Sequence, residues 1–174
     1  GLTKLRWLYL SDNQIDVSSL SGLTNLTYLD LSRNRITDVS SLSGLTSLTS
    51  LYLDDNQITD VSPLSELTNL RWWLDLGGNQ IIDVSSLSGL HNLKSLDLSS
   101  NQIADVSPIS RLTNLTALDL SSNDIADASL LNSLINLKSL NLSNNQITDA
   151  STLSNLTSLE SLNLSGNQVL DVSM

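Results

Sequence analysis

Residues 23–44 read LTNLTYLDLSRNRITDVSSLSG, and this stretch decides the fold. Its aliphatic residues and one asparagine stand in a fixed frame: Leu23, Leu26, Leu29, Leu31, Asn34, Ile36, Val39 and Leu42. The L-x-L step sends alternate side chains to opposite faces, which predicts a short strand with one buried face. One strand and one turn cannot bury so many leucines alone, so neighbouring segments must supply the surface against which this stretch packs.

The same frame recurs along the whole chain. The asparagine is repeated in steps of 21, 22, 23, 22, 22, 22 and 22 residues, at Asn13, Asn34, Asn56, Asn79, Asn101, Asn123, Asn145 and Asn167. The resulting coils are 2–22, 23–44, 45–66, 67–89, 90–111, 112–133, 134–155 and a truncated 156–174. Stacked coils of this length predict an α/β repeat solenoid, forming a single domain over 1–174. We expect a parallel sheet on its concave side and short 3-10 or helical turns on its convex side.

Two polar ladders follow from the repeat. The asparagine stands where the chain leaves the strand, and we expect its amide to satisfy backbone groups in the turn and in the next coil. The second ladder is Asp16, Asp38, Asp60, Asp83, Asp105, Asp127, Asp149 and Asp171. Each aspartate precedes V-S or A-S, where it can cap the helical turn on the convex side. The alternative is a row of calcium ligands, although calcium usually requires several oxygens converging on one point.

Two coils depart from the frame. The first lacks one residue between Ile15 and Val17, and the fourth carries an extra residue within Arg71-Trp72-Trp73-Leu74. A one-residue slip inside a strand would turn its buried face outward. We therefore expect the extra residue to form a bulge just before the strand.

The outward positions of the predicted strands change in character along the chain. All six aromatic residues fall in the first four coils, and the later coils carry serine, alanine, aspartate and asparagine there. Exposed tyrosine and tryptophan beside aspartate are typical of binding hot spots. The predicted partner-binding residues are Trp7, Tyr9, Tyr28, Asp30, Arg33, Arg35, Tyr52, Asp54, Trp72, Trp73 and Asp75. The competing interpretation is that these aromatics only stack on their neighbours across strands.

Composition excludes several functions. The net charge of −10 disfavours nucleic acid and anionic lipid surfaces. Cysteine is absent, and no apolar run is long enough to insert into a membrane. The only histidine, His91, stands on a predicted loop without a matching nucleophile, so we expect no enzyme activity, no cofactor and no metal.

Residues 58–64, ITDVSPL, followed by LTNL at 67–70, are similar to the repeats of internalin-type bacterial leucine-rich-repeat proteins. The resemblance covers nearly the whole chain. It implies a secreted or wall-anchored protein that grips a host or cell-surface receptor with its concave face. The family's helical N-terminal cap, immunoglobulin-like region and wall-sorting signal are not matched, so we expect an uncapped stretch of a longer protein.

Two functions remain open at this point. The first is a non-enzymatic scaffold that binds a partner protein on its concave face, at the bacterial surface or outside the cell. The second is a structural protein whose coils stack end to end into filaments. The residues alone leave a cytoplasmic location open, and the regular rows of the later coils also allow surface or ice binding.

Overall fold

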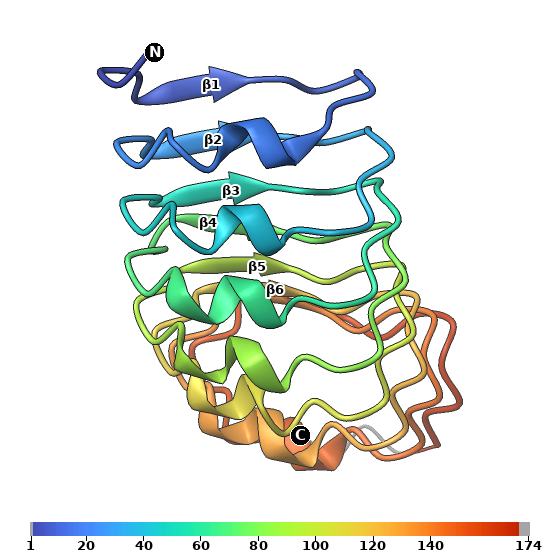
Figure 1. Ribbon diagram of the computed structural model, residues 1–174. Coiled ribbons are helices and arrows are strands. Elements are labelled where there is room, and N and C mark those ends of the chain that lie inside the picture. Colours follow the sequence, from blue (N-terminus) through green and yellow to red (C-terminus); the bar gives the residue numbers. More distant parts are fainter. Residues whose placement is uncertain (1, 171–174) are drawn as a thin grey trace.

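The computed structural model describes residues 2–170, which form eight strands connected by short 3-10 turns (Figure 1). The strands are β1 Trp7–Tyr9, β2 Tyr28–Asp30, β3 Ser50–Tyr52, β4 Trp73–Asp75, β5 Ser95–Asp97, β6 Ala117–Asp119, β7 Ser139–Asn141 and β8 Ser161–Asn163. The turns are η1 Val17–Leu20, η2 Ser40–Leu42, η3 Ser62–Glu66, η4 Ser85–Gly89, η5 Ile109–Arg111, η6 Ser129–Ser133 and η7 Ser151–Leu153. The predicted leucine-rich-repeat solenoid is confirmed, and every helical turn within 2–170 is of the 3-10 type.

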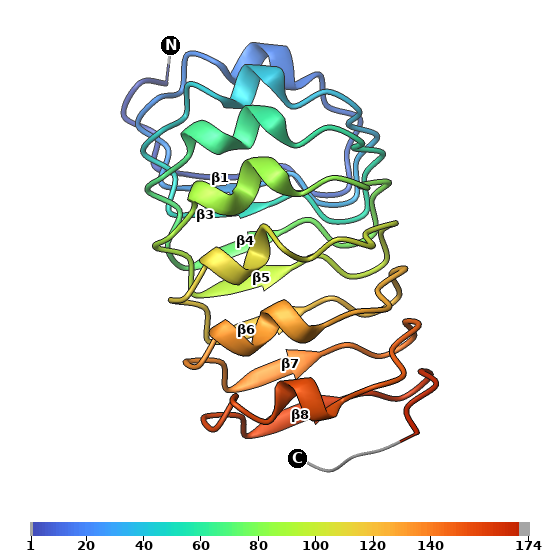
Figure 2. The same cartoon turned by 90° about the horizontal axis from the view of Figure 1, so that it is seen from below.

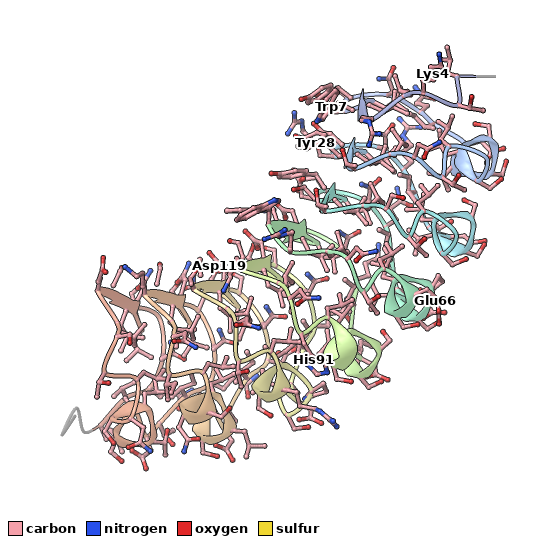
Figure 3. The ribbon with its side chains drawn as sticks, turned by 90° about the vertical axis from the view of Figure 1, so that its left-hand side faces the viewer. Lys4, Trp7, Tyr28, Glu66, His91 and Asp119 are labelled. Carbon is pink, nitrogen blue, oxygen red and sulfur yellow. The ribbon has the colours of Figure 1, made fainter. Side chains whose placement is uncertain are left out.

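The strands form one parallel sheet in chain order, from β1 to β8. Each strand is paired in register with the next, so that Leu8, Leu29 and Leu51 are lateral neighbours. Figure 2 shows the turns following one another along the body, and Figure 3 shows the sheet on the inner side of its curve. The first and third residues of each strand therefore face the concave side, as the sequence predicts.

The core is built from aliphatic side chains. In β3, for example, Leu51 is completely buried, and Leu53, just beyond the strand, is buried too. The aliphatic residue two positions after each asparagine and a buried leucine or isoleucine from each 3-10 turn close the other walls of the same cluster. No aromatic side chain belongs to this core within 2–170, which leaves the aromatics for the surface.

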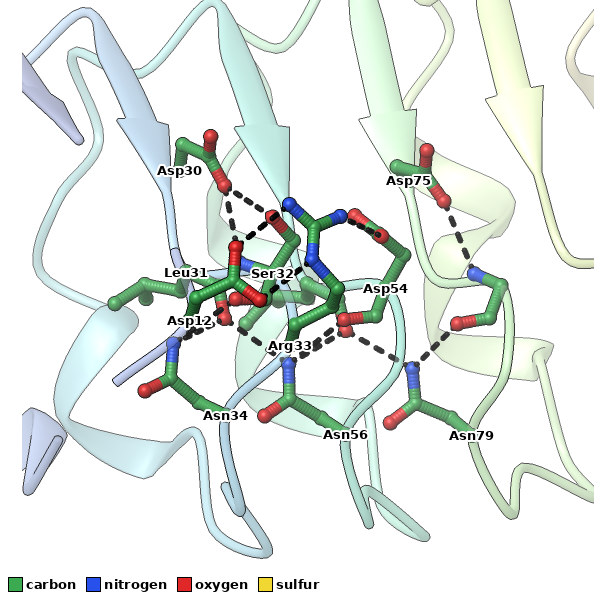
Figure 4. A network of polar contacts seen from close by, with 12 residues as sticks. Asp12, Asp30, Leu31, Ser32, Arg33, Asn34, Asp54, Asn56, Asp75 and Asn79 are labelled. Carbon is green, nitrogen blue, oxygen red and sulfur yellow. Dashed lines mark hydrogen bonds and ion pairs between the residues drawn. The ribbon is translucent and has the colours of Figure 1, made fainter. Parts of the chain in front are cut away.

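The asparagine ladder ties the coils together (Figure 4). The Nδ2 of Asn34 donates to the carbonyl oxygens of Leu31 and Ser32, at 2.9 and 3.1 Å. The same nitrogen donates to Leu10 O at 3.0 Å, and its Oδ1 accepts from Ile15 N at 3.3 Å. The structural role is confirmed, but the expected partner coil was wrong. The amide reaches the preceding coil, because Leu10 O and Ile15 N of that coil lie within hydrogen-bond distance of it.

The aspartate ladder caps the 3-10 turns. Asp38 Oδ1 accepts from Ser40 N at 2.8 Å, and the same contact recurs from Asp16 to Asp149. The hydrogen bond from Ser62 N lowers the pKa of Asp60 below its usual value, as expected for an accepting carboxylate. Asp171 lies outside the described residues.

The residue before each asparagine adopts a left-handed backbone conformation. Its φ lies between 50° and 70° at Asp12, Arg33, Asp55, Gly78, Ser100, Ser122, Asn144 and Gly166. Such values favour glycine, asparagine and aspartate, yet three coils use arginine or serine. The tight exit from the strand therefore imposes this conformation, whatever the residue type.

The extra residue of the fourth coil lies just before β4, as predicted. Leu74 pairs in register with Leu51 and is completely buried, so the strand keeps its buried face. Trp72 N donates to Thr49 O at 3.0 Å, and in the third coil the first strand residue, Ser50, makes the equivalent bond to Thr27 O. Trp73 pairs with Ser50 as the first residue of β4, and Arg71 O accepts from Lys94 N as Thr27 O accepts from Thr49 N, so Trp72 between them is the inserted residue.

Candidate binding face

Five aromatic side chains on the concave face form what we call the aromatic row: Trp7, Tyr9, Tyr28, Tyr52 and Trp73. From Tyr9 onward they alternate between the third and first positions of successive strands, so each lies diagonally across from the next, and Trp7 shares β1 with Tyr9. Ring centroids are 4.9 Å apart for Tyr9 and Tyr28, and 5.3 Å for Tyr28 and Tyr52. Tyr52 and Trp73 follow at 6.4 Å with nearly parallel rings. The rings make one continuous surface across four strands.

The aromatic row is both stacked and accessible. Trp7 and Tyr9 are 62% and 64% exposed, and Tyr28 and Tyr52 are half-buried between their neighbours. Figure 3 shows Trp7 and Tyr28 projecting from the sheet, on the side away from Glu66 and its turn. Cross-strand stacking thus holds the rings in place without hiding them, so stacking is compatible with a binding role.

Burial changes the acidity of the two central tyrosines. It raises the pKa of Tyr28 to about 12, with smaller contributions from the nearby Tyr52 and Asp30. Burial also raises the pKa of Tyr52, with Asp75 as the next cause. Both phenols are neutral at physiological pH, as an unperturbed tyrosine also is, so the rings add no charge to the concave face.

Beyond the aromatic row, three carboxylates line the third position of β4, β5 and β6. Asp75, Asp97 and Asp119, here called the concave carboxylates, are register neighbours. The pKa of Asp75 is raised to about 6, mainly by burial; the hydrogen bond from Gly77 N opposes the rise, and the neighbouring Asp97 and Asp54 contribute to it. Burial likewise raises the pKa of Asp97. The row continues as Asn141, whose Nδ2 donates to Asp119 Oδ2 at 2.8 Å.

A groove of about 190 Å³ runs along β5 to β7 beside Trp73. Its floor is formed by Leu96 and Leu118 together with the small residues of the first strand position, and two concave carboxylates line it. The groove is open because the first strand position carries tryptophan in β4 but only serine or alanine in β5, β6 and β7. Sequence reasoning left Asp97 and Asp119 out of the predicted site, although they repeat the position of Asp75.

The two predicted arginines have different surroundings. Arg33 forms a bidentate ion pair with Asp12, Nε to Oδ1 at 2.8 Å and Nη2 to Oδ2 at 2.9 Å. Its Nη1 also lies 4.0 Å from Asp54 Oδ2 (Figure 4). Arg35 lies beyond the asparagine, with Asp16 and Asp38 around a shallow depression on the side of the solenoid. Arg33 therefore lies beside Asp12 and Asp54, whereas Arg35 lies apart from the aromatic row.

Leucine-rich-repeat sequence profiles match most of the chain, at residues 14–58, 47–70, 73–111, 92–133, 113–155 and 135–174. The crystal structure of internalin C2 from Listeria monocytogenes is 37% identical, with a TM-score of 0.92, over 96% of this chain and 74% of that one. The chain belongs to the internalin-type leucine-rich-repeat family.

Two further solved structures are of longer leucine-rich-repeat chains. The crystal structure of the Listeria monocytogenes internalin InlF is 37% identical with a TM-score of 0.80, over 98% of this chain and 57% of that one. A leucine-rich-repeat protein of Leptospira interrogans is 31% identical with a TM-score of 0.90, over 97% and 45%. A comparison with curated protein sequences found no match. This internalin-type domain thus spans little more than half of InlF.

The rest of the internalin-type domain offers little for catalysis or metal binding within residues 2–170. His91 Nδ1 lies 3.4 Å from Arg111 O on an exposed loop, and the neighbouring acids Asp54 and Asp55 occupy an open surface. Nowhere in 2–170 do three histidine, aspartate or glutamate side chains gather as metal ligands would. That part of the chain also has no helix with the length and hydropathy of a membrane span. Leucine-rich repeats of this type generally mediate protein binding and are typically non-catalytic.

Proposed function

We propose that this internalin-type domain is a non-catalytic scaffold that binds a partner protein on its concave face, through the aromatic row. The continuous stack from Tyr9 to Trp73 is the observation that carries the proposal. Large rings that are already ordered lose little conformational entropy on binding, and such residues dominate the energetics of interfaces. Of the residues predicted from the sequence, the proposal keeps all except Trp72 and Arg35, which lie outside the stack.

Charge supports a basic partner surface. Asp54, Asp75, Asp97 and Asp119 follow the aromatic row on the concave side, and Arg33 is already engaged by Asp12. A lysine or arginine of the partner could enter the groove beside Trp73, where an aromatic face and carboxylates both attract a cation. Complementary charge mainly accelerates association and selects partners.

The proposed location is the bacterial surface or the extracellular space. Similarity to two internalins supports it, and the proposed partner is accordingly a host or cell-surface protein. The domain would bind its partner there through a rigid surface and without a cofactor.

The test compares the wild-type domain with Tyr28→Ser/Tyr52→Ser. Both proteins are used to capture partners from host-cell and bacterial surface extracts, and the Kd of each retained protein is then measured. Because the double change removes the centre of the stack, we expect the affinity to fall by about 100-fold or more. Ser161→Ala alters the first strand position of β8, outside the groove beside Trp73, and serves as the control with wild-type affinity.

If the tyrosine double variant binds with the same Kd as the wild type and has an unchanged circular dichroism spectrum, the aromatic row is not the binding site. Sedimentation velocity over a range of concentrations tests the alternative of end-to-end assembly. A sedimentation coefficient that grows with concentration, and no partner for either protein, would favour the filament over the scaffold.

A further inference from the structure

A second polar depression lies on the side of the solenoid where the chain rises towards the strands. We call it the flank site, and it is lined by Asn69, Arg71, Trp72, Asn92, Lys94 and Asn114. Its volume is about 430 Å³, more than twice that of the groove beside Trp73. The proposed function on the concave face makes no use of these residues.

Trp72 is present in the flank site because of the insertion in the fourth coil. It precedes β4 and does not belong to the stack of the aromatic row, and 56% of its surface is exposed. The guanidinium of Arg71 lies 4.6 Å from the centre of its ring. This contact orients the indole while much of the ring stays open to solvent. An exposed, oriented tryptophan offers a flat apolar surface for another ring.

Two cations of the flank site lack an acidic partner. Lys94 N donates to Arg71 O at 2.9 Å, so the two residues are neighbours on adjacent coils. Within 2–170, neither side chain has a carboxylate at ion-pair distance, whereas Lys138, at the same repeat position as Lys94, pairs with Glu160 at 2.9 Å. Two adjacent uncompensated cations on a chain of net charge −10 favour a bound anion.

The three asparagines of the flank site supply fixed acceptors. Each Nδ2 donates to a carbonyl oxygen of the preceding coil, for Asn69 to Thr46 at 2.8 Å and for Asn114 to His91 at 2.8 Å. The bond from Asn92 to Thr68 is 3.2 Å. In the described part of the chain no donor reaches the Oδ1 of these amides, so three oriented acceptors remain for the hydroxyl groups of a ligand.

We propose that the flank site binds an acidic saccharide, of the class that contains uronic acids. Such a ligand combines the three features that the site offers. Its carboxylates would pair with Arg71 and Lys94, its hydroxyl groups would donate to the asparagine oxygens, and the apolar face of one sugar ring would lie against Trp72. A simple anion would leave the indole and the amides unused, and a neutral sugar would leave the two cations uncompensated.

Calorimetric titration of the folded domain with tetragalacturonate tests the proposal. Maltotetraose is the neutral probe and citrate is the probe without a sugar ring. We expect tetragalacturonate to bind at least about tenfold more tightly than either, since a hydrogen bond to a charged group contributes about that factor. Trp72→Ala and Lys94→Gln should each raise the Kd for tetragalacturonate by about tenfold.

Lys138→Gln is the matched control, because it removes a lysine at the same repeat position two coils away. It should leave the Kd unchanged, and circular dichroism shows whether each variant is folded. The proposal is overturned if tetragalacturonate does not bind in the millimolar range, or if maltotetraose or citrate binds equally well. It is overturned as well if neither Trp72→Ala nor Lys94→Gln changes the Kd while both variants are folded.

Discussion

A buried asparagine of the ladder satisfies several backbone groups in two neighbouring coils with a single side chain. Asn101 Nδ2 donates to Leu98 O and Ser99 O at 3.1 Å, and to Leu76 O in the preceding coil at 3.0 Å. Its Oδ1 accepts from Ile81 N at 2.9 Å. The asparagine is buried, so no water could replace these bonds without opening the turn.

Asn101→Ala should therefore lower the free energy of unfolding by about 3 kcal/mol, because several buried polar groups lose their partner at once. Urea denaturation followed by circular dichroism measures the change. Asn13→Ala is the control at the same repeat position, because Asn13 is exposed and bonds only to Leu10 O and Ser11 O. Equal losses in the two variants would contradict a role in joining coils.

A pH-dependent term in stability arises at Asp75. Its pKa is about 6 in the folded protein, mainly through burial, and close to 3.9 in an unfolded chain. The folded state thus holds this proton more tightly, so the stabilising contribution is complete below about pH 4. It is lost as the pH rises through about 6. Above that pH the folded state carries an unfavourably buried charge.

Asp75→Asn should remove this penalty, since asparagine occupies the same strand position at Asn141 and Asn163. We expect the variant to be more stable than the wild type by on the order of 2 kcal/mol near pH 7, and by almost nothing near pH 4. Unfolding free energies from urea titrations at both pH values provide the measurement. A difference independent of pH would mean that burial does not shift the pKa of Asp75.

At the scale of the elements, the strand β4 shows how the solenoid accommodates an insertion. Trp72 lies outside the ladder of register pairs, so deleting it should leave a regular coil with Leu74 still opposite Leu51. We expect the melting temperature to change by only a few degrees, as for other surface changes. In contrast, inserting an alanine between Leu74 and Asp75 should turn Leu76 outward and unfold the coil. Equal melting temperatures for the two variants would mean that placing the extra residue before β4, and not within it, does not preserve the strand.

The strands and turns could be predicted because the frame encodes them twice, in the leucine spacing and in the asparagine ladder. The insertion could be placed before β4, but the two adjacent tryptophans could not be assigned, since either would keep Leu74 in step. The left-handed residue before each asparagine was not foreseen, because serine and arginine at Ser100 and Arg33 carry no signal for it. Side-chain pairs between coils depend on three-dimensional distance, so neither the Arg33–Asp12 bridge nor the flank site could be predicted.

The candidate site was predictable to the extent that strand alternation reveals it. The aromatic row lies on the concave face as the alternation indicates, and its partner-binding role remains a prediction. The diagonal stacking from Tyr9 to Trp73 depends on rotamers, which the sequence does not specify. Arg33 and Arg35 both stand at the predicted strand exit, where either could supply charge to a partner, but Arg35 lies with Asp16 and Asp38 at a separate depression.

At the scale of the whole molecule, the two proposed sites lie on different surfaces, one on the concave face and the other on the flank. The concave face joins aromatic rings to carboxylates, and the flank site joins one tryptophan to uncompensated cations. Both meet at the fourth coil, where Trp72 and Trp73 point to different surfaces. A partner protein on one face and a saccharide on the other could therefore be bound together, which a titration of one in the presence of the other would measure.

The net charge sets the response of the whole fold to salt. The chain has 18 acidic and 8 basic residues, and few ion pairs offset the repulsion among residues 2–170. Since the screening length falls from about 30 Å at 0.01 M to about 8 Å at 0.15 M salt, repulsion across coils should weaken over this range. We expect the melting temperature at neutral pH to rise by a few degrees with sodium chloride, and equally with tetramethylammonium chloride. A rise with sodium alone would indicate a bound cation instead of screening, and a fall would mean that the ion pairs outweigh the repulsion.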